Sequence, residues 1–139
     1  GERKEEFLET LKENNIEYVF YGEVYDQNEQ NRIFEKCAFG LNLMKESVCV
    51  GLTMKSLDYF KVGLPILNNI KWDTSILVDK RNIGYNITVE NADEKAKQIV
   101  SLTEKELIQL RKNTKNVFYD TFAEKVYRKH MDELLGGII

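Results

Sequence analysis

The residues best suited to chemistry lie between Val50 and Asn69, in the run VGLTMKSLDYFKVGLPILNN. A glycine-bearing loop leads there into a short predicted helix, for which Thr53 is a suitable N-cap residue. The first turn of a helix leaves backbone N–H groups without intrahelical partners, and the helix dipole adds partial positive charge at the same end. A loop and helix start of this kind predicts an anion site, with phosphate as the favoured anion.

Two charged side chains extend this predicted site. Lys55 supplies a mobile cation, and Asp58, one helical turn later, supplies a carboxylate that can accept hydrogen bonds from sugar hydroxyls. Residues three apart lie on the same face of a helix, so the two groups are expected close together. A sugar linked to phosphate, as in a nucleotide, is the ligand that this pair predicts. The alternative is a surface ion pair, which contributes only about 0.2–1 kcal/mol.

The run KSLDYFKVGLPIL resembles the donor-binding motif of GT-B glycosyltransferases of the glycosyltransferase 4 type, in which a lysine, two residues, an acid and an aromatic precede Gly-x-Pro. The resemblance implies that Asp58, in place of the more common glutamate, holds the ribose of a nucleotide-sugar donor. Many members carry another glutamate eight positions earlier, which contacts the transferred sugar, and Val50 stands there in this chain. Glu46 could substitute for it if the loop folds back.

The resemblance extends over nearly the whole chain and implies a function. A nucleotide diphosphate sugar would dock on this lobe, and a sugar would pass to a hydroxyl of an acceptor glycan or lipid-linked glycan. The acceptor would arrive from an N-terminal lobe of the same protein, which would also supply any general base. Polysaccharide or glycoconjugate synthesis in the cytoplasm is the expected setting, with the full-length protein peripheral at the membrane as a further option. The family generally needs no bound metal, so the co-substrate is the only small molecule expected.

Helices and strands alternate along the predicted chain, which indicates an α/β fold with a Rossmann-like parallel sheet flanked by helices. The predicted strands are IEYVFYG, AFGLNLM, PILNN and IGYNI. The predicted helices are 3–14, a helix from Ile33 after the polar segment 26–32, the motif helix, 73–79, 92–101, 104–116 and 122–135. By resemblance, this is the C-terminal half of a GT-B fold.

The loops that leave the strands complete the predicted site, because ligands of open α/β sheets sit beyond the carboxyl ends of the strands. Gly51 and Leu52 lead into the motif helix. Gly22 and Tyr25 follow the first predicted strand. The ring of Tyr25 could stack on a nucleotide base, and the alternative is a half-exposed residue at the rim.

The length and charge of the chain limit its possible domain organisation and partners. With 139 residues, the chain is expected to form a single lobe, 1–139, without the acceptor lobe and without the first strands of the family's donor lobe. An unpaired strand edge would then favour a dimer of the fragment, and the fragment alone is expected to be inactive in sugar transfer. A net charge of −3, with interleaved Lys, Arg, Asp and Glu, argues against nucleic-acid binding.

A non-catalytic nucleotide-binding or oligomerisation module is the competing prediction, because Val50 removes one expected acid and a fold does not fix a function. Cys37 and Cys49 are predicted to be reduced thiols in or near the core. Trp72 is expected to pack or to anchor a loop, and His130 is expected at the surface.

Overall fold

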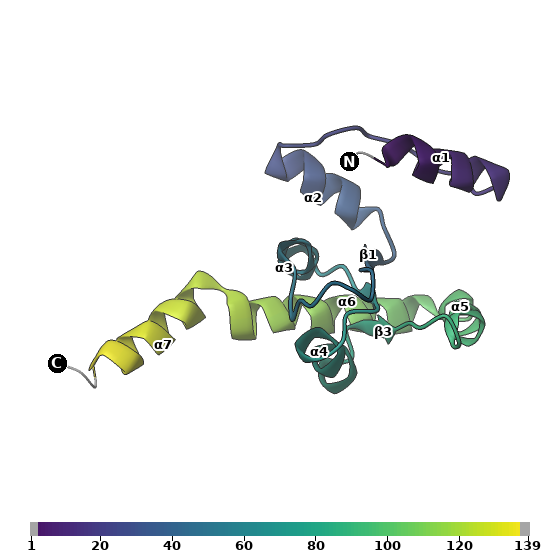
Figure 1. Ribbon diagram of the computed structural model, residues 1–139. Helices are drawn as coiled ribbons and strands as arrows, with labels where there is room; N and C mark the ends of the chain where they lie inside the picture. The colour runs from purple at the N-terminus through teal and green to yellow at the C-terminus, as the bar shows by residue number, and fades with distance from the viewer. Residues whose placement is uncertain (1–2, 137–139) are drawn as a thin grey trace. The chain divides into compact units, whose positions relative to one another are not determined.

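The computed structural model describes residues 3–136, and the chain divides into two compact units, Gly1–Gln30 and Asn31–Ile139. Figure 1 shows the elements along the chain. The first unit contains α1 (Lys4–Glu13), which confirms the first predicted helix. Asn15 follows it with φ 54°, a left-handed conformation in which asparagine is common, and this ends the helix where the sequence predicted.

The predicted strand IEYVFYG is wrong. Residues 16–26 contain no strand in the structure, and Val19, Phe20 and Tyr21 are 74%, 51% and 53% exposed. The preference of such residues for strands expresses their fit to a pleated, half-buried surface. Within the described residues no neighbouring strand pairs with this segment, so its composition alone does not make it a strand.

The second helix, α2 (Gln27–Glu35), begins earlier than predicted and crosses from the first unit into the second. The cause is a cap within the polar segment. A side-chain oxygen of Asp26 accepts a hydrogen bond from the backbone N–H of Glu29 at 2.8 Å. This satisfies one of the free donors in the first turn, so the helix forms before the apolar residues begin.

The second unit is built on a parallel three-stranded sheet in the order β1-β2-β3, which confirms the α/β class. The strands are β1 (Gly40–Asn42), β2 (Ile66–Asn68) and β3 (Gly84–Asn86). An open parallel sheet flanked by helices is consistent with a Rossmann-like arrangement. Each strand is shorter than its predicted run.

Two helices connect the strands and fix the position of the loops at their carboxyl ends. α3 (Met54–Val62) joins β1 to β2 and packs on β1, whereas α4 (Asp73–Arg81) joins β2 to β3 and packs on both of them. Gly63 ends α3 with φ 70°, and Pro65 then precedes β2, so the predicted helix stop and strand start are confirmed.

The remaining helices are α5 (Ala92–Val100), α6 (Glu104–Val117), the π-helical turn η1 (Phe118–Phe122) and α7 (Glu124–Gly136). α6 packs against both α3 and α4, and η1 packs against α3. α7 runs on from η1 and leads away from the strands (Figure 1). The core of this unit is formed by Tyr59, Phe60, Leu64, Ile66, Val78, Ile83 and Val117.

Alternate strand residues face opposite sides of the sheet, and the two sides differ in burial. Gly40 lies beneath the Tyr59 ring of α3, and a Cβ at that glycine would come within 2.7 Å of the ring. Leu41 points to the other side and is 52% exposed. The sheet is therefore covered on the α3 side and partly open at β1 on the other.

Of the predicted side-chain environments, those of Cys37 and His130 are confirmed and that of Cys49 is wrong. Cys49 is exposed, while Cys37 is half-buried against the core, and both are free thiols. Trp72 is 66% exposed in the loop before α4, so of its two predicted roles packing is wrong and anchoring a loop stays a prediction. His130 is exposed on α7, as predicted.

Candidate functional site

The start of α3 has the geometry that the sequence predicted. Thr53 is the N-cap residue, with extended backbone, and its hydroxyl oxygen accepts a hydrogen bond from the backbone N–H of Ser56 at 3.1 Å. Within residues 3–136, the backbone N–H groups of Met54 and Lys55 donate to no other atom. Two donors at the positive end of the helix dipole are therefore available to a ligand.

The charge within the first turn of α3 also favours an anion. Every other α-helix of the described residues has an acidic residue in its first turn. The first turn of α3 has none and contains Lys55. Lys55 is exposed and Asp58, in the next turn, is half-buried. The two side chains form no ion pair in the described part of the molecule, so the predicted alternative of a surface salt bridge is wrong.

The loop that leads into α3 is held at one end by the loop after β2 and at the other by the start of α4. Asn69 accepts from the backbone N–H of Met44 at 2.7 Å and donates its amide to the Met44 carbonyl at 2.8 Å. At the other end, the backbone N–H of Thr74 donates to the Gly51 carbonyl at 3.2 Å, and the hydroxyl of Thr74 donates to the same oxygen. These contacts fix Gly51, two residues before the N-cap of α3, against the start of α4.

An acidic side chain lies beside this loop. If Gly51 carried a Cβ, that atom would be 2.9 Å from a carboxylate oxygen of Asp73, the first residue of α4. Trp72, just before it, has φ 72° and ψ −124°, a conformation that non-glycine residues rarely adopt. Backbone strain of this kind concentrates at functional sites. Asp73 is a nearby side chain that the sequence analysis did not assign to the site.

Three asparagines, two of them buried and the third half-buried, form a polar row beneath the helix start. Asn42, Asn68 and Asn86 end the three strands and are aligned in register. The amide of Asn42 donates to the side-chain oxygen of Asn68 at 2.8 Å, and the amide of Asn68 donates to that of Asn86 at 2.9 Å. The oxygen of Asn42 accepts from the hydroxyls of Thr53 and Ser56 at 3.0 and 3.1 Å. The row therefore joins the ends of the strands to the start of α3.

The sequence carried a signal for this row that the analysis did not use. The three strands read GLN, ILN and GYN, so each ends in asparagine at the position where a parallel sheet presents its ligand loops. A polar residue at the same point of successive apolar strands is unusual, because a buried amide needs a partner.

The other predicted residues take no part in the hydrogen bonds described above for residues 3–136. Leu52 is half-buried and packs against the hydrophobic core. Glu46 is exposed in a turn closed by a hydrogen bond from the N–H of Val48 to the Lys45 carbonyl at 2.9 Å. Gly22 and Tyr25 belong to the first unit, where Gly22 has φ 75° and Tyr25 is 87% exposed. The Tyr25 hydroxyl donates to a carboxylate oxygen of Glu23 at 2.7 Å. Tyr25 is more exposed than the predicted alternative of a half-exposed rim residue.

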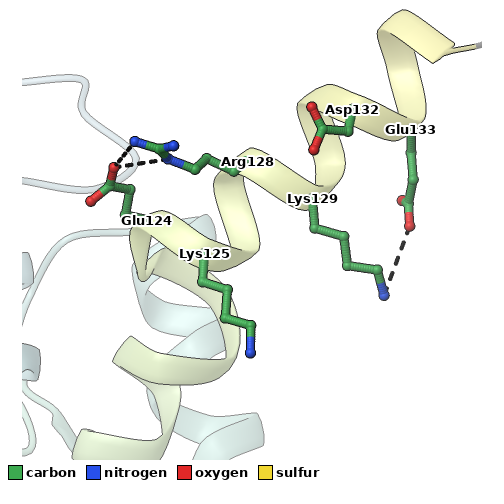
Figure 2. A pocket seen from close by; sticks show the side chains of 6 residues that line it. All are labelled: Glu124, Lys125, Arg128, Lys129, Asp132 and Glu133. Carbon is green, nitrogen blue, oxygen red and sulfur yellow. Dashed lines mark hydrogen bonds and ion pairs between the residues drawn. The ribbon is translucent and has the colours of Figure 1, made fainter.

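Two surface hollows lie elsewhere, and neither includes a predicted site residue. Figure 2 shows one on α7, lined by Glu124, Lys125, Arg128, Lys129, Asp132 and Glu133. All six come from one helix face, and two i,i+4 ion pairs, Arg128–Glu124 and Lys129–Glu133, neutralise part of its charge. The other is lined by α1 and the residue before it, Arg3, Glu6, Phe7 and Thr10. A hollow formed by one solvated helix face does not enclose a ligand.

Among residues 3–136, no three histidine, cysteine, aspartate or glutamate side chains gather as a metal site would require. In the same range, no helix has both the length and the apolar character to cross a bilayer. Comparison of the chain with known protein families, with curated proteins and with solved structures gave no match.

Proposed function

We propose that this chain is the donor-binding lobe of a glycosyltransferase, similar to the C-terminal half of GT-B enzymes of the glycosyltransferase 4 type. The enzyme would move a sugar from a nucleotide diphosphate sugar to an acceptor hydroxyl during polysaccharide or glycoconjugate synthesis. The motif KSLDYFKVGLPIL carries the resemblance. The parallel sheet with helical crossovers supports the fold that this proposal requires.

One observation carries the proposal: the start of α3. It presents the free N–H groups of Met54 and Lys55, carries no acid in its first turn and lies on the loop that follows β1. Backbone donors, a helix dipole and an ammonium group together match the charge of a diphosphate. The loop is held by Asn69 and Thr74, so the donors are in place before a ligand arrives.

Each proposed role follows from the chemistry of the group. Lys55 and the amides of the first turn would bind the diphosphate, and Asp58 would accept hydrogen bonds from the ribose hydroxyls. Asp73, beside Gly51, offers a second carboxylate for hydroxyls of the transferred sugar, a role that the sequence analysis gave to Glu46. A carboxylate accepts hydrogen bonds strongly from hydroxyl donors, which gives specificity for a sugar over a bare phosphate.

The same groups would also increase the rate of sugar transfer in the full-length enzyme. As the acceptor hydroxyl attacks the anomeric carbon, the bond to the leaving diphosphate breaks and negative charge grows on its oxygens. Fixed amides and the Lys55 ammonium stabilise that charge more strongly in the transition state than in the bound substrate. The acceptor and a general base would come from a second lobe of the same protein, so this chain alone would bind donor without transferring sugar.

The test is a calorimetric titration of the chain with UDP, GDP and their sugars. Lys55→Ala should weaken binding about 10- to 100-fold, because it removes a charge-assisted contact. Asp58→Ala should weaken nucleotide binding and leave inorganic pyrophosphate binding unchanged. Lys61→Ala, an exposed lysine in the last turn of the same helix, is the matched control and should bind like the unmodified chain. Absence of nucleotide binding by the unmodified chain would overturn the proposal.

A second candidate, an oligomerisation module, is favoured by apolar side chains that the second unit leaves uncovered. Leu41 on the sheet and Tyr127 and Leu134 on α7 are 52%, 63% and 67% exposed. Apolar surface of this kind often marks a contact with another protein. Sedimentation analysis separates the candidates: a stable oligomer that binds no nucleotide supports the module, and a monomer that binds nucleotide supports the donor lobe.

A further inference from the structure

The row of asparagines beneath α3 needs a functional explanation, because apolar residues would be the ordinary choice at its positions. Asn42, at the end of the edge strand β1, and Asn68, at the end of the central strand β2, are 3% and 0% exposed. Burying an amide costs free energy unless all its polar atoms find partners. Here they do: within the described residues, no buried side-chain oxygen or nitrogen lacks a hydrogen bond.

The partners of the row are the loops that surround the candidate site. Asn68 donates to the Ile70 carbonyl at 2.8 Å and accepts from the Ile70 N–H at 3.2 Å, which shapes the turn after β2. Asn86 donates to the Ser75 carbonyl at 3.1 Å and to the carboxylate of Asp79 at 2.9 Å, both on α4. The row thus connects β1, β2 and β3 with the loops and helices that follow them.

Asn42 has the most direct connection to the proposed diphosphate site. Its single side-chain oxygen accepts from two hydroxyls, those of Thr53 at the N-cap of α3 and Ser56 in its first turn. These two residues bracket Met54 and Lys55, whose N–H groups donate to no other atom of residues 3–136. The oxygen of Asn42 therefore ties the residues on either side of these donors to the end of β1.

We propose that Asn42 is a positioning residue of the diphosphate site: it holds the first turn of α3 so that the amides of Met54 and Lys55 are fixed before the ligand binds. This inference rests on the proposed function. Donors that are held in place lose little freedom on binding, so a residue that never touches the ligand controls affinity. An apolar residue at the same point would fill the space but would not set the direction of the helix start.

The experiment compares Asn42→Ala with Thr114→Ala. Thr114 is a matched control, since it is 0% exposed, sits in α6 and donates its hydroxyl to the Leu110 carbonyl of its own helix at 2.8 Å. Both variants remove a buried polar side chain and should lower the melting temperature. Asn42→Ala should also weaken UDP or GDP binding by about tenfold or more, by analogy with the loss of other supporting contacts, whereas Thr114→Ala should not.

A double-mutant cycle shows whether Asn42 acts through the N-cap. In a Thr53→Ser background the hydroxyl remains, so Asn42→Ala should still weaken binding about tenfold. In a Thr53→Val background only the Ser56 hydroxyl still donates to Asn42, so Asn42→Ala should have a smaller additional effect. Equal effects in both backgrounds would overturn the inference. If Asn42→Ala fails to fold, Ser56→Ala, which removes one of the two donors to Asn42, should weaken binding in its place, and unchanged binding would overturn the inference.

A ligand-free measurement keeps this inference separate from the proposed function. Amide hydrogen exchange at Ser56, whose N–H is bound by Thr53, should become faster in Asn42→Ala and remain unchanged in Thr114→Ala. Unchanged exchange in both variants would overturn the positioning role of Asn42. If the unmodified chain binds none of the probes, the proposed function fails, and the exchange comparison still decides whether Asn42 positions the start of α3.

Discussion

The hydroxyl of Thr53 donates to the side-chain oxygen of Asn42 across 3.0 Å, which ties the N-cap of α3 to the last residue of β1. The same hydroxyl oxygen accepts from the backbone N–H of Ser56. One side chain therefore both caps the helix and attaches it to the sheet. The geometry of the candidate site depends on this double role.

Replacing Thr53 with valine should lower the free energy of unfolding by about 1–2 kcal/mol, the usual cost of a lost helix cap. Valine has the same shape but no hydroxyl. Thr53→Ser keeps the hydroxyl and should remain within about 0.5 kcal/mol of the unmodified chain. Urea unfolding measures both variants, and equal stability of the valine and serine variants would show that the hydroxyl does not hold the helix.

Gly84 is expected to tolerate no side chain. Its φ is 148°, and a Cβ at this position would lie 1.9 Å from the backbone carbonyl oxygen of Ile66 on the adjacent strand. Relief would require β2 and β3 to separate. Gly84→Ala should therefore destabilise the chain by at least about 3 kcal/mol, measured by urea unfolding.

Gly136, at the end of α7, is the control for this substitution, because a Cβ there would meet nothing within 4 Å. Gly136→Ala should change stability by less than about 0.5 kcal/mol. A Gly84→Ala chain as stable as Gly136→Ala would contradict the close approach of β3 to β2.

Stability should fall at alkaline pH because of Tyr59. Burial, followed by the nearby Cys37 and Asp58, raises the pKa of Tyr59 to about 12, above the usual value of about 10. Between these values the unfolded chain loses the tyrosine proton and the folded chain keeps it. Unfolding is then favoured as pH rises from about 10 to about 12, and the stabilisation is fully present below pH 10.

Tyr59→Phe removes this titration together with a long hydrogen bond of 3.5 Å to the Leu41 carbonyl. The stability difference between the two chains should shrink or reverse as pH rises through that range, measured by urea unfolding at each pH. A difference that does not change with pH would contradict the burial of the phenol.

The sequence predicted much of the second unit because local signals and tertiary packing agree there. Thr53, Gly63 and Pro65 mark the ends of α3 and the start of β2 through capping and backbone preferences that act within a few residues. The segment Ile16–Tyr21 has equally strong strand residues, yet forms no strand in the structure. Strand formation depends on a partner, which a local pattern does not reveal.

The candidate site was predicted only in part, because local patterns reveal helix ends but not contacts between different elements. Thr53 and Lys55 follow from the rules of a helix start, whereas the contact of Asn42 with Thr53 joins residues of two different elements. The closeness of Asp73 to Gly51 joins residues 22 positions apart in the sequence and depends on the register of the loops. Contacts of this kind come from the fold and not from spacing.

The most direct test of the donor-site proposal is the NMR mapping of a bound nucleoside diphosphate on the ¹⁵N-labelled chain. Addition of UDP or GDP should shift the amide resonances of Met54, Lys55 and Ser56 most strongly, because the diphosphate would accept hydrogen bonds at the start of α3. The amide of Lys61, in the last turn of the same helix, should shift little. Saturable shifts centred elsewhere in the chain, with those three amides unchanged, would contradict the proposed site.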